Sequence, residues 1–193
     1  MKAGKSTALE CTLALLTATA LSFVRVRLWP NGGEVTLFSL LPLIVISRRQ
    51  GTHAGLLCSL CYGLIRLFAE RSALAPLGFW PALGAAALGY IFSCTAIGFS
   101  SVRTARRHAS ARDFALSMGI AFGTRCLLAY PALLIKAVDT IGVFSAKAFG
   151  WALGQEATGM LPEAVLTIIA ALLLNEWTRL MDRQGLLIDA SAI

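Results

Sequence analysis

A small set of aromatic and charged side chains in this sequence has the chemistry to hold an amphipathic cation. Trp151 is followed within five positions by Gln155 and Glu156. A tryptophan ring attracts a cation to its face, and a carboxylate shielded from water pairs with one. For each tryptophan, anchoring at a membrane interface is the alternative. The candidate ligand-binding residues of this kind are Trp29, Glu34, Trp80, Trp151, Gln155 and Glu156.

Arg125 is a charged residue within an otherwise apolar stretch, GIAFGTRCLLAYP. A charge at that depth of a bilayer is costly and by default marks a functional site with a partner. A structural ion pair with a carboxylate from a neighbouring helix is the alternative. Glu163 follows Pro162 at the expected start of a helix, where the helix dipole alone accounts for a carboxylate.

The common motifs of hydrolytic and nucleotide-binding chemistry are missing from the sequence. It has no Walker A, HExxH or GxSxG pattern, and its two histidines, His53 and His108, are far apart. Cys58 and Cys61 form a CxxC inside an apolar segment, which we interpret as packing. We therefore expect no enzymatic activity, no catalytic residue, no metal site and no cofactor.

The composition is that of a membrane protein. The chain is 57% hydrophobic and 14% charged, with a mean hydropathy of +0.73. Soluble domains are about 25% charged, so most of this chain is expected to lie in lipid, without a separate soluble domain. We predict an all-α bundle, one domain over 1–193. Its six transmembrane helices are expected over 8–26, 35–47, 53–69, 78–100, 113–138 and 160–178.

The distribution of basic residues predicts the orientation of these helices. With the N-terminus inside, the inner segments hold more Lys and Arg than the outer ones, and RTARRHASAR at 103–112 is the densest basic segment. Both termini are therefore expected on the cytoplasmic side. We interpret 103–112 as an anchor at anionic headgroups, with docking of a cytoplasmic partner as the alternative. Nucleic-acid binding is not expected, because no aromatic residues interleave with these charges.

Small residues at four-residue spacing predict close contacts between helices. Gly55, Ser59 and Gly63 form such a row in the third expected helix, and Ala14 and Ala18 form a shorter one in the first. Rows of this kind let neighbouring helices approach closely in a bilayer.

The segment 9–68 resembles the thiamine-specific substrate-binding (S) component of energy-coupling factor transporters, the ThiT family. Met160–Glu163 and Leu88–Gly89 extend the resemblance along the chain. The residues of 9–68 that carry it are Pro30, Gly32, Gly33, Thr36, Ser39, Pro42, Arg49, Gly51, Gly55, Leu56, Tyr62 and Gly63.

The resemblance implies capture of thiamine or a related small heterocycle at the outer face of a prokaryotic cytoplasmic membrane. It also implies three protein partners, a coupling transmembrane subunit and two cytoplasmic ATPases, which alone would use ATP. Ala14 and Ala18 look like the family's AxxxA contact for the coupling subunit.

Several positions of the family's thiamine site hold other residues here. The family's acidic–aromatic pair before the fourth helix falls on Trp80–Pro81, and its fifth-helix histidine falls near Ala129 or Tyr130. Its Tyr–Asn pair falls on Gln155–Glu156. The resemblance thus implies a rebuilt thiamine site, or a site for a thiamine precursor or another vitamin, and adds Tyr130 to the candidates.

Two other functions compete with this interpretation. A self-sufficient secondary transporter would need an internal repeat and an ion-coupling residue at mid-membrane. We find no repeat between the halves, and Arg125 is a poor proton relay. The other competitor is a structural membrane protein whose pocket no longer binds a ligand.

Overall fold

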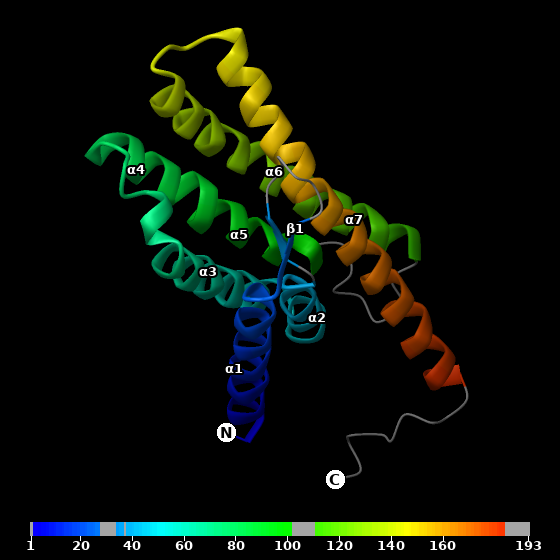
Figure 1. The fold of residues 1–193 in the computed structure, drawn as a ribbon. Helices are drawn as coiled ribbons and strands as arrows, with labels where there is room; N and C mark the ends of the chain where they lie inside the picture. The colour runs from blue at the N-terminus through cyan, green and yellow to red at the C-terminus, as the bar shows by residue number, and fades with distance from the viewer. Residues whose placement is uncertain (1, 28–33, 37, 102–110, 184–193) are drawn as a thin grey trace.

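The computed structural model describes residues 2–27, 34–36, 38–101 and 111–183, and these are almost wholly helical (Figure 1). The segments α4 to η3 follow one another directly and form one helical stretch, part of it in π-helical geometry. The elements are α1 (Lys2–Ser22), β1 (Arg25–Arg27), β2 (Glu34–Thr36), α2 (Leu41–Gln50), α3 (Thr52–Ala69), η1 (Arg71–Ala73), α4 (Phe79–Ala86), η2 (Ala87–Phe92), α5 (Ser93–Thr95), η3 (Ala96–Ser101), α6 (Ala111–Ile141) and α7 (Ala146–Arg183).

In the described part of the chain, four helical segments are long and apolar enough to cross a membrane. They are Thr52–Ala69, Phe79–Ser101, Arg112–Ile141 and Ala146–Leu174. The apolar part of α1 is shorter, and α2 has only 10 residues where a span needs about 20. The fold is therefore a multi-pass helical bundle, while the count of six spans and the cytoplasmic termini stay predictions.

A short β-hairpin is formed by residues that we expected at the end of the first helix and the start of the second. Strands β1 and β2 pair antiparallel, with Val26 opposite Val35 and Arg27 opposite Glu34. This differs from the expected helices 8–26 and 35–47, because α1 ends at Ser22 and α2 begins at Leu41. β-Branched residues favour extended backbone, and cross-strand pairing satisfies backbone groups that a helix would otherwise satisfy.

The chain between α6 and α7 is also shorter than the expected connection over 139–159. Most of that segment belongs to α7, and the turn contains Gly142 in the left-handed region at φ 78°. Ala148 and Ala152 are fully buried against Ala137 of α6, and this packing outweighs the low helix propensity of the nearby glycines. The two long helices lie side by side and join at the top of Figure 1.

The predicted row of small residues on α3 is confirmed as a close-packing face. A Cβ placed on Gly63 would lie 2.7 Å from the carbonyl oxygen of Tyr90 in η2. A Cβ on Gly55 would collide with Ser47 of α2, and Ser59 between them is fully buried. The α3 backbone therefore packs closely against α2 at Gly55 and against η2 at Gly63. The second contact fixes the backbone position of Tyr90.

Substitution Gly63→Ala should destabilise the protein, because the Tyr90 carbonyl is backbone and cannot turn away from the added methyl group. Overpacking of this kind costs about 1–3 kcal/mol, or several degrees in Tm for a chain of this size. Thermal unfolding of the detergent-solubilised protein measures the effect.

Gly119→Ala in α6 is the matched control, because a Cβ there meets no atom within 4 Å. We expect this variant to be at least as stable as the wild type, because alanine favours a helix over glycine. Equal Tm values for the wild type and both variants would contradict the close contact at Gly63.

Candidate functional site

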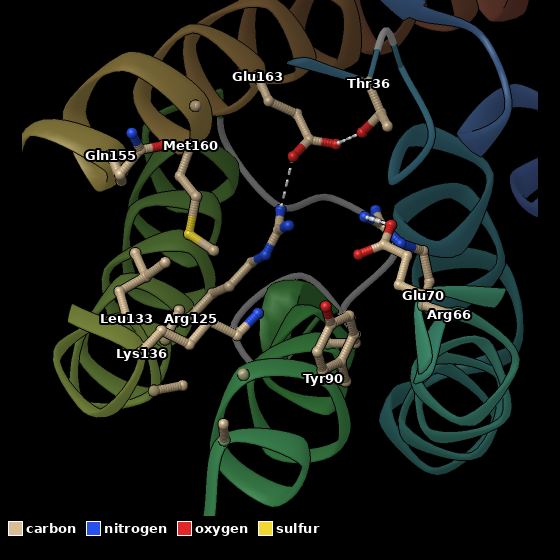
Figure 2. A pocket seen from close by; sticks show the side chains of 16 residues that line it. Thr36, Arg66, Glu70, Tyr90, Arg125, Leu133, Lys136, Gln155, Met160 and Glu163 are labelled. Atoms are coloured by element: carbon tan, nitrogen blue, oxygen red, sulfur yellow. Dashed lines mark hydrogen bonds and ion pairs between the residues drawn. The ribbon is translucent and has the colours of Figure 1, made fainter. Parts of the chain in front are cut away.

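A cavity of about 230 Å³ lies between α3, the α4–α5 stretch, α6 and α7, with β2 at its edge (Figure 2). Its walls combine apolar groups such as Ala85, Ala132 and Leu133 with a concentration of charged and polar side chains. These polar side chains are Thr36, Arg66, Glu70, Tyr90, Arg125, Lys136, Gln155 and Glu163.

Glu163 of α7 is the point where several elements meet. One carboxylate oxygen accepts hydrogen bonds from the hydroxyl of Thr36 in β2 and, at 2.9 Å, from that of Ser39 just before α2. The other accepts a hydrogen bond from Nη1 of Arg125 in α6 at 3.1 Å. Glu163 and Arg125 are 4% and 5% exposed, so this ion pair is buried. Arg125 thus has a carboxylate partner on a neighbouring helix, which is the structural alternative given in the sequence analysis.

A second charged group lies at the C-terminal end of α3. Arg66 pairs with Glu70 one helical turn later, and Arg25 of β1 donates to the same Glu70 oxygen at 2.9 Å. Burial opposes ionisation of Glu70, but Arg66 outweighs it and holds the pKa of this carboxyl below its ordinary value. The Tyr90 hydroxyl also favours the ionised form of Glu70, whose oxygen Oε1 is shared by the two arginines.

Lys136 of α6 reaches the cavity from the wall opposite Glu70. Its ammonium group lies 5.4 Å from the centre of the Tyr90 ring, a distance suited to a cation–π contact. Figure 2 shows Lys136 and Tyr90 on the side of the cavity away from Glu163, while Arg125 extends from the same side as Lys136 toward that carboxylate.

The π-helical geometry of η2 bears directly on the cavity. Gly89 and Tyr90 belong to this segment and line the cavity wall. A π-helical turn inserts a residue relative to an α-helix, and such turns are frequent at functional sites. A Cβ on Gly89 would lie 3.0 Å from Cβ of Ala132 in α6, so a glycine keeps α6 close at this level.

Arg125 and Gln155 line the cavity, as two of the candidates from the sequence. Glu156 is buried at 7% exposure beside the thiol of Cys126, on the same face of α7 as Met160 and Glu163. Neither carboxylate oxygen of Glu156 has a hydrogen-bond partner among the described residues.

The aromatic candidates with described side chains lie away from this cavity. Trp80 is 77% exposed at the start of α4, edge-on to Phe79, beside a separate hollow that includes Phe144. Trp151 is 40% exposed, and Tyr130 packs against the small cluster around Ala137.

The remaining candidates divide between described and undescribed parts. Trp29 lies outside the described residues, and of Glu34 only the backbone in β2 is described. Ala14 lines a surface groove between α1 and α2, whereas Ala18 is fully buried in the main core.

Several cavity residues were not among the sequence candidates: Arg66, Glu70, Tyr90, Lys136 and Glu163. Arg66 and Lys136 lie near the ends of the expected helices 53–69 and 113–138, and Glu163 lies at the expected start of another helix. One signal was present, because Arg66 and Lys136 are charges within or at the end of apolar segments, and Arg66 has an acid four residues later. Among the described residues no group of three His, Cys, Asp or Glu side chains is placed to hold a metal ion.

The comparisons with known proteins agree with this architecture. The structure is similar to a solved structure of ThiT from Listeria monocytogenes, with a TM-score of 0.68 over 90% of this chain and 94% of that one. The two sequences are 19% identical, so this similarity concerns the fold. No curated protein sequence matches the chain.

The sequence itself matches a transporter family over most of its length. Residues 8–179 match the family described as Thiamine transporter protein (Thia_YuaJ), which confirms the resemblance found on 9–68. The matched range contains every residue that lines the cavity. The protein is therefore a multi-pass membrane transporter protein and not an enzyme, and the chain belongs to the thiamine transporter family.

Proposed function

We propose that this chain is the substrate-binding component of an energy-coupling factor importer in the cytoplasmic membrane. In this role it captures thiamine or a related small heterocycle from the outer face. The observation that carries the proposal is the family match over 8–179, which includes all the segments that build the cavity.

The cavity between α3, α6 and α7 is the proposed ligand site. Its volume of about 230 Å³ is somewhat below the usual range for small-molecule sites, roughly 300–1,000 Å³. Apolar walls with a few convergent polar groups are typical of such sites. The Arg125–Glu163 pair holds α6, α7 and β2 in register around it, so the polar groups stand in place before a ligand arrives.

Glu156 is the proposed acceptor for a cationic ring or ring amino group. A buried carboxylate without a partner is costly, and a ligand that supplies a positive charge or a hydrogen-bond donor removes that cost. The neighbouring α7 residues Gln155 and Met160 line the cavity, so a small rearrangement of this helix brings Glu156 to the ligand. Trp29, Trp80 and Trp151 stay candidates for stacking on the ligand.

In the proposed role, ATP-driven transport requires partners, because the sequence contains no ATP-binding motif of its own. The proposed partners are a coupling transmembrane subunit and two cytoplasmic ATPases. Ala14 is the accessible member of the proposed coupling contact, since it lines the groove beside Leu41 and Pro42. Ala18 is buried in the free chain, so its participation requires α1 to shift against α2.

Glu156→Gln should weaken thiamine binding by about tenfold or more, because it removes the charge while keeping the size and shape of the side chain. Hydrogen bonds to charged groups contribute about 1.5–3 kcal/mol. Isothermal titration calorimetry of the purified protein in detergent measures the Kd. Glu176→Gln, an exposed change on the same helix, is the control and should bind like the wild type. Unchanged thiamine affinity in Glu156→Gln would remove this residue from the site.

Uptake of labelled thiamine should occur only when the chain is co-expressed with a coupling subunit and its ATPases. The physical reason is that a binding component without an energy source cannot accumulate its ligand. The measurement is uptake in a host without endogenous thiamine transport or coupling modules. Accumulation by the chain alone would instead support a self-sufficient transporter.

A further inference from the structure

The charge balance of the cavity is positive. Among its described lining residues, Arg66, Arg125 and Lys136 are cations, while Glu70 and Glu163 are the acids. Arg25 adds a further positive charge on Glu70, and the buried Glu156 adds a negative one near Arg125. With these two included, four basic side chains still face three carboxylates.

Both lining carboxylates are already paired with arginine side chains. Glu163 already accepts hydrogen bonds on both oxygens from Thr36, Ser39 and Arg125. Glu70 is shared by Arg25 and Arg66. A ligand that offers only positive charge would have to share Glu70 or Glu163 with an arginine, or rely on Glu156.

Two basic side chains that line the cavity have hydrogen-bond donors without an acceptor in the described part of the chain. Nε of Arg125 is buried and has no hydrogen-bond partner among the described residues, although the side chain is only 5% exposed. Lys136 forms no ion pair within the described part of the chain, and its contact there is with the face of the Tyr90 ring. Both residues belong to α6 and line the same cavity (Figure 2).

We infer that the ligand of this cavity carries an anionic group, a phosphate or a carboxylate, which binds between Lys136 and Arg125. The inference rests on the proposed function, because it specifies the ligand class of the same site. An anion there pairs the free ammonium and accepts from the free guanidinium Nε, and charge-assisted contacts of this kind are the strong ones. It also cancels the excess positive charge, which a purely cationic ligand would increase.

The test compares ligands that share the heterocycles of thiamine and differ in charge on the side arm. The probes are thiamine, thiamine monophosphate and the carboxylic acid formed by oxidation of the hydroxyethyl arm. A phosphate monoester carries about −1.5 to −2 at pH 7. Isothermal titration calorimetry on the full chain in detergent should show at least one anionic derivative binding about tenfold or more tightly than thiamine.

Substitution of Lys136 should remove this preference. In Lys136→Met the ratio of the two affinities should fall to near one, and in Lys136→Arg it should be largely retained. Lys136→Glu should reverse the order, so that thiamine binds more tightly than either anion. Lys147→Met, at an exposed lysine outside the cavity, is the control and should leave the ratio unchanged.

The outcomes separate the inference from the proposed function. Thiamine binding as tightly as both anionic derivatives, or more tightly, would overturn the inference and leave the proposed function standing. An anion preference that Lys136→Met and Lys136→Glu both preserve would overturn the assignment to this cavity. Absence of binding by all three probes to a folded protein would overturn the proposed function, and the inference with it.

Discussion

A buried carboxylate that must be satisfied by distant parts of the chain is the constraint on which this structure depends. Glu163 takes its donors from Thr36 and Ser39, which are 127 and 124 residues away in sequence, and from Arg125, 38 residues away. Removing one partner of such a buried pair leaves an unpaired charge and typically costs 3–5 kcal/mol. The hairpin, the start of α2, α6 and α7 are therefore held together by one side chain at the edge of the cavity.

This constraint also determines what is left for a ligand. Because Glu163 takes up one end of Arg125, the guanidinium is fixed with Nε unpartnered in the cavity wall. Close packing of α3 against η2 at Gly63 fixes the Tyr90 backbone, and the Tyr90 ring in turn lies beside Lys136. The lining carboxylates are thus paired with arginines, while Nε of Arg125 and the Lys136 ammonium have no acceptor among the described residues. This difference is the basis for the anionic group inferred on the ligand.

Features that depend on local spacing were predictable from the sequence. Apolar composition indicated a helical membrane protein, the Gly55–Ser59–Gly63 row indicated close packing of α3, and Arg125 within an apolar stretch indicated a buried partner. The hairpin was missed because its strands have only three residues each and adjoin apolar helices. The early start of α7 was missed because the segment contains three glycines and a proline, which disfavour a helix. The packing of Ala148 and Ala152 against α6 that stabilises the helix is visible only in the structure.

The charged residues of the cavity illustrate the same limit. Lys136 and Arg66 stand near the ends of the expected helices 113–138 and 53–69, where a charge usually faces water, so the sequence alone did not assign them to a site. Their burial depends on Tyr90 and Glu70, and the position of Tyr90 depends on a π-helical segment that no local pattern indicates. Glu163 follows a proline at an expected helix start, where the helix dipole alone explains a carboxylate. Its structural role becomes visible only with its hydrogen-bond donors Thr36, Ser39 and Arg125.

The most direct test of the account is a structure of the protein purified in the presence of thiamine monophosphate. We expect density for the compound between α3, α6 and α7, with its phosphate within hydrogen-bonding distance of Lys136 and Arg125. We also expect the Arg125–Glu163 pair to stay intact in that complex. Density in the hollow beside Trp80, or an empty cavity in a protein that binds the compound saturably in solution, would contradict the account.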